Sequence, residues 1–215
     1  MAETGGMYTT GDLLSVVDLT ELSAGTNLLV LGADEPAMHE FGMELAAVGP
    51  DGEGVLVISG THGPDEIVAE FQNATGGDDQ LSRLTILDCT GADDEASELP
   101  PEQVMQVKSM GSLTEIGMAF VQYEDEQGLA SDGTRVLIDS ISEIADHLDE
   151  ERVFEFVNAF IGRIQTSQHL GIWLMDTSAH SEQTIATFME PFDLVLEVSG
   201  TGGDRELRLR DPSDG

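Results

Sequence analysis

The 215-residue chain has 42 acidic residues against 8 basic ones, which gives a formal net charge of −34 at pH 7. It is nevertheless 40% hydrophobic, enough for one substantial core and therefore one domain. Regular apolar segments along the chain exclude a disordered acidic protein. Acid spread over an ordinary core is typical of a halophilic protein, because molar salt shortens the Debye length to about 3 Å. The charge therefore indicates the solvent rather than a ligand.

Cys89 is the single cysteine, so we expect no disulfide framework and a reducing compartment. It follows a predicted strand, which favours a small buried hydrophobe over a nucleophile. No apolar run approaches the roughly 18 residues of a membrane helix. Residues 1–12 lack the basic region and apolar stretch of a signal peptide. We therefore expect a cytoplasmic protein.

In chain order, a lead-in (residues 1–25) comes first, with a short helix or extended segment predicted at 11–22. Strands are then predicted at 26–31, 54–59, 84–88, 134–138 and 171–175, with a strand or an irregular piece at 103–108. Helices predicted between them span 36–48, 64–74, 112–121, 150–166 and 181–188. The final strands, 194–199 and 205–210, flank a glycine-rich turn and form a predicted hairpin.

Local signals indicate where several helices begin or end. Pro36 stands at the first helical position, and Gly49 lies just past the end of the same helix. Ser112 and Glu115 have the spacing of a capping box. After them, one helical face is predicted to hold Leu113, Ile116, Gly117, Phe120 and Val121. Asp149 can cap the long helix 150–166, whose predicted apolar stripe is Val153, Phe156, Val157, Phe160, Ile161 and Ile164.

The alternation of strands and helices predicts an α/β fold. Right-handed crossovers then give a mostly parallel central sheet flanked by helices on both faces, closed by the C-terminal antiparallel hairpin. We expect residues 1–215 to form a single domain. Within it, residues 91–101 are predicted as an acidic linker and 211–215 as a flexible tail.

The chain resembles the KaiC-like branch of the RecA-type P-loop ATPases, particularly the short single-domain archaeal forms, and its acidity resembles a haloarchaeal member. The resemblance covers nearly the whole chain and implies a three-layer RecA-like fold. It depends on the order and spacing of five segments: the lead-in with the strand 27–32, the strand 55–59 with its helix start at 64–66, residues 112–117, residues 136–142, and the terminal hairpin.

The resemblance places a phosphate loop at residues 32–39, where only Gly32 matches the motif. Ala37, Met38 and His39 stand where the second glycine, the lysine and the Mg²⁺-binding hydroxyl belong. Methionine cannot supply the lysine's charge, and imidazole is a poor Mg²⁺ ligand beside oxygen. This is a degenerate Walker A motif.

The rest of the implied ATPase site is also incomplete. The Walker-B aspartate corresponds to Asp139, but residues 60–62 replace the glutamates that polarise the attacking water. Asp34 and Glu35 place carboxylates at the helix N-terminus that would hold a phosphate, so we expect them to satisfy its free N–H groups instead. The predicted remnant of a nucleotide site consists of Gly32, Asp34, Met38, His39 and Asp139.

Other residues have ordinary structural interpretations. Asp139 is interpreted as a strand-end cap for the helix after Ser140, in preference to a residual Mg²⁺ site. His39 and His62 could pair at a metal across adjacent loops, but two histidines without a third ligand favour ordinary loop polar residues. Lys108 is expected to be a solitary surface lysine. We therefore assign no catalytic residue, no cofactor and no metal.

The sequence thus predicts a non-catalytic RecA/KaiC-like domain, a pseudo-ATPase with a regulatory or scaffolding role. Its expected partner is a related active ATPase, a signalling protein or a second copy of itself. One alternative is an ATP-binding or weakly hydrolysing enzyme with a divergent site. Another is an accessory factor in DNA recombination, although no basic patch supports nucleic-acid binding.

Overall fold

The computed structural model describes residues 6–92, 99–128 and 133–211. In this part of the chain, one eight-stranded sheet has the order β10-β9-β3-β8-β7-β4-β5-β6. All neighbouring strands in it are parallel except β10 and β9. The strands are β3 (Asn27–Gly32), β4 (Gly54–Ser59), β5 (Leu84–Asp88), β6 (Val104–Gln106), β7 (Thr134–Asp139), β8 (Leu170–Asp176), β9 (Leu194–Ser199) and β10 (Glu206–Arg210).

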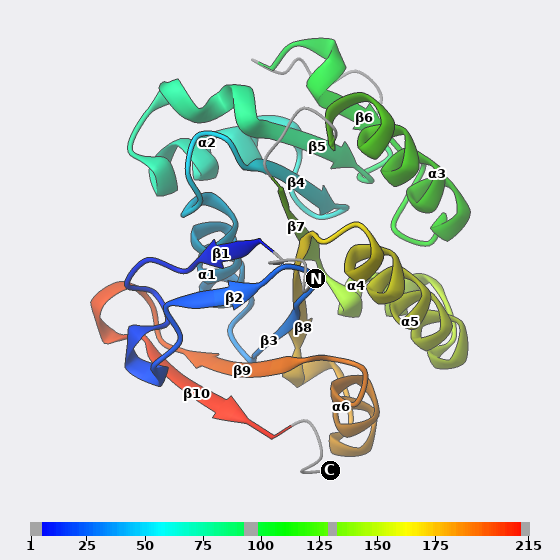
Figure 1. Cartoon of the computed structure of the whole chain (residues 1–215). Coiled ribbons are helices and arrows are strands. Elements are labelled where there is room, and N and C mark those ends of the chain that lie inside the picture. The colour runs from blue at the N-terminus through cyan, green and yellow to red at the C-terminus, as the bar shows by residue number, and fades with distance from the viewer. Residues whose placement is uncertain (1–5, 93–98, 129–132, 212–215) are drawn as a thin grey trace, which may run out of the picture.

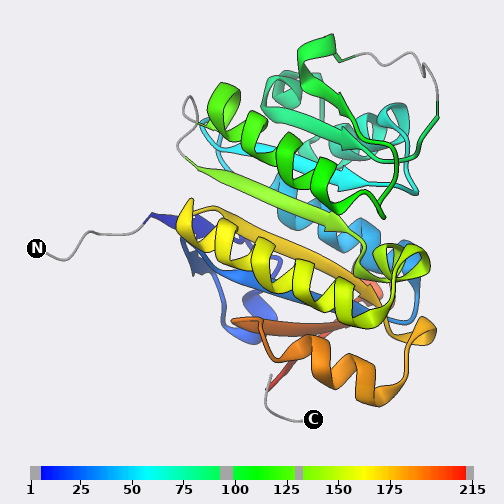
Figure 2. The same cartoon turned by 90° about the vertical axis from the view of Figure 1, so that its right-hand side faces the viewer.

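Helices cover both faces of this sheet, as Figures 1 and 2 show. On one face lie α1 (Glu35–Ala47) and α2 (Pro64–Thr75). On the other lie α3 (Leu113–Tyr123), α4 (Ile141–His147), α5 (Glu150–Thr166) and α6 (Glu182–Met189). The predicted α/β fold, a mostly parallel sheet between two helical layers with a C-terminal antiparallel hairpin, is confirmed.

Two hydrophobic cores lie on opposite faces of the sheet, and single strands contribute to both. In β3, Leu28 and Val30 belong to the core beneath α1 and α2, whereas Leu29 and Leu31 belong to the core beneath α3 to α6. Successive side chains of a strand point to opposite faces, so a strand covered on both sides must be apolar throughout. This explains the uninterrupted apolar runs in the sequence.

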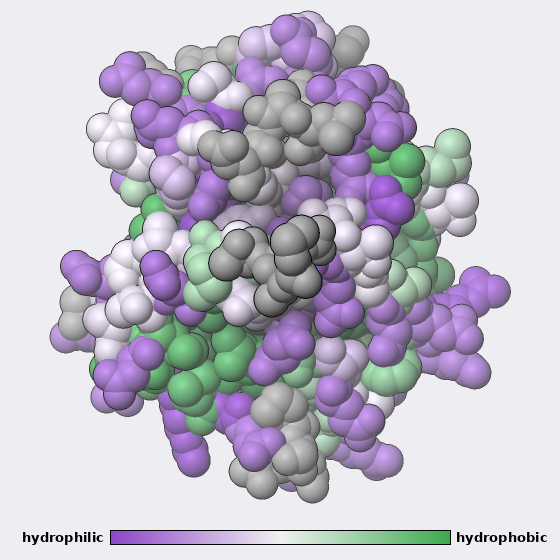
Figure 3. Space-filling model, in the orientation of Figure 1, coloured by the Kyte–Doolittle hydropathy of each residue, from purple (hydrophilic) through white to green (hydrophobic). Residues whose placement is uncertain are grey.

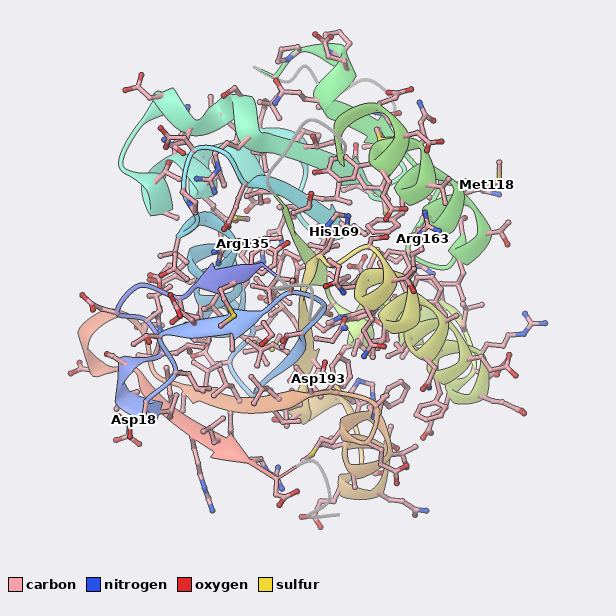
Figure 4. All side chains as sticks on the ribbon, in the orientation of Figure 1. Asp18, Met118, Arg135, Arg163, His169 and Asp193 are labelled. Carbon is pink, nitrogen blue, oxygen red and sulfur yellow. The ribbon has the colours of Figure 1, made fainter. Side chains whose placement is uncertain are left out.

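The lead-in forms a small antiparallel sheet, β1 (Met7–Thr9) with β2 (Glu21–Ser23), joined through a 3₁₀ turn at Ser15–Val17. The segment 11–22, predicted as a short helix or an extended stretch, contains this 3₁₀ turn and the first two residues of β2. Arg135, at the start of β7, attaches this small sheet to the domain by donating from Nη2 to the Thr9 carbonyl oxygen at 2.8 Å. Figure 4 shows Arg135 beside β1.

The predicted capping box at α3 is wrong. Ser112 precedes the helix, but its side chain accepts no hydrogen bond from the first turn. Its hydroxyl lies 3.3 Å from that of Ser109 instead, and Glu115 accepts from the backbone N–H of Lys108 at 3.3 Å. Both side chains therefore bond to groups other than those that a capping box requires. Val121, predicted on one helical face with Ile116 and Phe120, is exposed, whereas those two are buried.

Several other predictions can be compared with the described residues. Asp149 caps α5 by accepting from the Arg152 N–H at 3.1 Å, as predicted. The helix expected after Ser140 is α4, which begins at Ile141. The acidic linker 91–101 and the tail 211–215 are described only in part, because 93–98 and 212–215 lie outside the described residues. Among the helices described, none is long and apolar enough to cross a membrane.

Candidate functional site

Two histidines stack against each other at the carboxyl end of the sheet. His39 lies in the second turn of α1, and His62 lies in the loop between β4 and α2. Their ring centroids are 3.9 Å apart, and the ring planes are tilted by 30°. Strands β4 and β7 are neighbours, with Ser59 opposite Asp139 at their ends, so the Asp139 carboxylate reaches the same place.

Asp139 is the centre of this cluster, and its side chain is only 4% exposed. Its Oδ2 atom accepts hydrogen bonds from the Ser59 hydroxyl at 3.2 Å and from His62 Nδ1 at 2.9 Å. Nδ1 of His39 also lies 2.9 Å away, as an ion pair outside the direction of a good hydrogen bond. Burial opposes ionisation, but the two histidines outweigh it and hold the pKa of Asp139 well below its ordinary value.

The outer nitrogens of both rings face carboxylates. Nε2 of His39 is 2.5 Å from Glu70 Oε2 on α2, and Nε2 of His62 is 3.9 Å from Glu35 Oε1. Burial lowers the pKa of His39, but Asp139 and Glu70 together raise it from 6.5 to about 10. The hydrogen bond to Asp139 raises the pKa of His62, against burial and the neighbouring charge of His39.

Both ends of α1 are held, which fixes His39. At the N-terminus, Asp34 Oδ1 accepts from the Ala37 N–H at 3.2 Å. At the C-terminus, Arg135 Nη1 donates to the Leu45 carbonyl at 3.0 Å, and Arg83 Nη2 donates to the Ala47 carbonyl at 3.3 Å. A helix end leaves such groups without intrahelical partners, and cations there meet the negative end of the dipole.

The loop that holds His62 is fixed from both sides. The Ser59 hydroxyl accepts from the His62 N–H at 3.1 Å, and the Thr61 hydroxyl donates to Glu143 Oε2 on α4 at 3.0 Å. A Cβ atom at Gly60 would lie 2.3 Å from Glu143 Oε1 and 2.6 Å from Met110 Cγ. A side chain at this position would displace Glu143 or Met110, so the turn passes close against α4.

A cavity of about 520 Å³ opens between α1 and α2 beside the two histidines. Its described lining residues include five glutamates and no lysine or arginine; the glutamates are Glu35, Glu40, Glu44, Glu66 and Glu70. A larger hollow of about 770 Å³ lies elsewhere, against α3 and β6, and contains none of the clustered groups. The histidine cluster therefore adjoins the smaller, acidic cavity rather than the larger hollow.

Residues 25–198 match the model of DUF7504, which is described as a family of unknown function. The chain belongs to the DUF7504 family. A comparison with curated proteins found no match.

Among solved structures, the DUF7504 chain is similar to the uncharacterized protein PH0321 of Pyrococcus horikoshii, solved in complex with an unknown peptide. The TM-score is 0.67 at 13% identity, covering 92% of this chain and 88% of that one. It is also similar to the KaiC-like protein PH0186 of Pyrococcus horikoshii OT3, with a TM-score of 0.59 at 17% identity, covering 88% and 80%. These similarities confirm a RecA/KaiC-like fold and leave the activity open.

The five residues predicted as a nucleotide-site remnant do not all meet in this DUF7504 structure. Asp34 caps α1 as predicted, and His39 and Asp139 lie together in the cluster. Met38 points into the apolar core and is buried. Gly32 ends β3, where a Cβ atom would lie 3.1 Å from Met38 Cβ. The interpretation of these five residues as the remnant of a nucleotide site stays a prediction.

Two of the sequence interpretations are wrong. Asp139 does not cap α4; the Ser140 hydroxyl does so, by accepting from the Glu143 N–H at 3.3 Å. His39 is not an ordinary loop residue, because it is buried within α1. Glu70 was not singled out at all. It comes from a different helix, 31 positions from His39, and nothing local in the sequence signals that contact.

Proposed function

We propose that this DUF7504 protein is a non-catalytic RecA/KaiC-like domain that acts through contacts with other proteins, in a regulatory or scaffolding role. The observation that carries the proposal is the engagement of Asp139. Its carboxylate is buried and bonded to His62 and Ser59, with His39 in contact, in the position where the resemblance expects an acid serving a nucleotide-bound Mg²⁺.

A Mg²⁺-triphosphate would have to compete with these internal partners. Removing one partner from a buried charge is strongly unfavourable, because the charge that remains loses its compensation. The phosphate itself would meet Asp34, which already satisfies an N–H group of α1, and Glu35 in the first turn. An anion placed among carboxylates is repelled, and Met38 offers no charge to offset this. These contacts support loss of ATP turnover.

Exposed apolar side chains support a role in protein contacts. Val16, on the 3₁₀ turn of the lead-in, is 71% exposed, and Leu209, on β10, is 40% exposed. The 3₁₀ turn and β10 contact each other. Figure 3 shows hydrophobic surface over this part of the molecule. A second site is on α3, where Met118 points away from the molecule in Figure 4. The bound peptide of PH0321 is consistent with a partner of this class.

The decisive experiment measures ATP turnover and thermal stability in molar KCl with millimolar Mg²⁺-ATP. We expect no turnover above background and no rise in the unfolding midpoint. A ligand present at a hundredfold excess over its dissociation constant stabilises the native state by about 2.7 kcal/mol, so binding would be visible. ATP turnover that disappears in Asp139→Ala and persists in the exposed control Asp146→Ala would instead establish the weakly hydrolysing alternative.

The proposed contacts are tested separately, by affinity capture in high salt followed by identification of the bound proteins. We expect a reproducible partner, whether a related active ATPase, a signalling protein or a second copy of the chain. Binding should weaken in Val16→Glu and persist in Met118→Glu if the lead-in surface is used, with the reverse result for α3. Retention of the partner by both variants, and by the double variant, would contradict contacts through these apolar residues.

A further inference from the structure

The histidine cluster has the arrangement of a metal site. One ligand atom each from His39, His62 and Glu70 can be chosen so that all three lie within 4.8 Å of one another. Both rings turn Nδ1 inward to the same Asp139 oxygen, with each nitrogen 2.9 Å from it. Both Nε2 atoms consequently face outward, where the carboxylates of Glu70 and Glu35 lie.

We propose that His39, His62 and Glu70 bind one divalent transition-metal ion, with Zn²⁺ as the preferred ion, and that Asp139 orients both imidazoles. The inference is independent of the proposed loss of ATP turnover, because a metal held by these side chains requires no nucleotide.

The ligand types favour zinc over magnesium. Two imidazole nitrogens with one carboxylate oxygen form a common Zn²⁺ ligand set, usually completed by a fourth group from solvent or substrate. Mg²⁺ prefers six oxygens and retains several waters. The open position here would face the cavity between α1 and α2, where Glu35 lies 3.9 Å from His62 Nε2. The site thus has three strong ligands and space for a fourth.

The surroundings match what metal-binding histidines need beyond their direct contacts. Such a histidine almost always donates its other ring N–H to a carboxylate or carbonyl, which fixes the tautomer and the ring orientation. Asp139 serves both rings, and Ser59 supports it with a hydrogen bond of 3.2 Å. For His39 the contact is electrostatic, because its buried Nδ1 lies 2.9 Å from this carboxylate outside the direction of a good hydrogen bond.

Metal binding would bring the three ligand atoms to a set spacing. Zn–N distances are about 2.0–2.1 Å, so ligand atoms around one ion are roughly 3.3 Å apart, whereas the three atoms here lie within 4.8 Å of one another. His39 is fixed within α1, but the other two ligands can adjust. His62 lies in a loop, and the Glu70 side chain is 32% exposed. The ion would also replace the hydrogen bond that now joins Glu70 to His39, and the proton on His39 Nε2 would be released to solvent.

The experiment uses chelator-cleared full-length protein in molar KCl with a large excess of Mg²⁺, which occupies adventitious carboxylate sites on this acidic surface. Zn²⁺ is titrated by calorimetry, and Co²⁺ is titrated by visible absorption, because tetrahedral nitrogen ligation gives Co²⁺ a stronger band than octahedral carboxylate ligation. We expect one equivalent of either ion and the intense Co²⁺ band.

Two variants and two matched controls locate the site. His62→Gln and Glu70→Gln should each weaken Zn²⁺ binding by at least tenfold and remove the Co²⁺ band, since even second-shell losses cost 10–100-fold. Glu66→Gln changes another glutamate that lines the same cavity. His180→Gln changes a histidine outside the cluster, bonded to Ser142. Both controls should bind normally. Circular dichroism and metal-free unfolding must show that every variant compared is folded.

Absence of saturable Zn²⁺ binding under these conditions would overturn the proposal. So would binding of equal strength in folded His62→Gln, Glu70→Gln and the two controls, because the ion would then be on surface carboxylates. If either ligand variant does not fold, the remaining one decides. ATP turnover is not a readout here, so failure of the metal site and failure of the proposed function give separate results.

Discussion

Replacement of Arg135 by methionine should be among the most damaging single substitutions in this protein. The Arg135 side chain is 0% exposed, and its Nε donates to Glu53 Oε2 at 2.6 Å. Its other two nitrogens donate to the carbonyls of Leu45 and Thr9. The guanidinium also lies over the Tyr8 ring, 5.4 Å from the centroid. One side chain thus joins β7, α1 and the lead-in.

Methionine at position 135 would fill most of the volume but leave Glu53 buried without its cation. Breaking a buried ion pair by removing one partner costs about 3–5 kcal/mol. That is a large part of the roughly 5–15 kcal/mol that holds a typical domain folded. The loss should persist in molar KCl, because salt screens buried pairs far less than exposed ones. Urea unfolding at fixed KCl concentration measures the change.

Arg163→Met provides the matched control. Arg163 donates from Nε to Glu124 Oε2 at 2.7 Å, but its own side chain is 46% exposed, and Glu124 keeps a hydrogen bond from Ser167. Exposed pairs of this kind contribute about 0–1 kcal/mol. Replacing both Arg135 and Glu53 by methionine should recover much of the loss, since an apolar pair leaves no buried charge. An Arg135→Met protein within about 1 kcal/mol of the wild type would refute the argument.

Two further predictions test the surface charge and the buried thiol. With a net charge of −34, the thermal midpoint should fall steeply as KCl is lowered from molar to tenth-molar, and an unchanged midpoint would contradict the halophilic interpretation. Burial raises the pKa of Cys89 from 9.0 to about 12, so the folded thiol stays neutral where the unfolded one ionises. Its contribution to stability is therefore present below about pH 9 and lost towards pH 12. A thiol reagent should label the native protein far more slowly than the urea-unfolded protein. Equal labelling rates would show that the thiol is accessible.

Most of the regular elements could be predicted because their signals are local. The strands 54–59 and 84–88 and the helix 150–166 have the predicted bounds, since each is an apolar run or stripe between clear start and stop residues. The Asp34 cap was predictable for the same reason: its partner is only three residues away. The failed capping box at Ser112 shows the limit, because Ser109 lies equally close in sequence and competes for the hydroxyl.

The site could be predicted only in part, because its contacts join distant positions. Asp139 was singled out because the resemblance places the Walker-B aspartate at the end of this apolar strand, but its partner His62 lies 77 positions away. The sequence offered two histidines and left the third ligand unidentified. Glu70 acquires its role only when α2 packs beside α1, and its neighbours on that helix, such as Glu66, look the same in sequence.

The few basic residues explain how so acidic a chain can position this cluster. Arg83 and Arg135 both donate to carbonyls at the C-terminal end of α1, while Asp34 caps its N-terminus. Such forked donation to several oxygens is a property of arginine that lysine lacks. An acidic surface with almost no lysine is therefore compatible with these contacts. Arg83 and Arg135 are buried, and they hold the helix that carries His39.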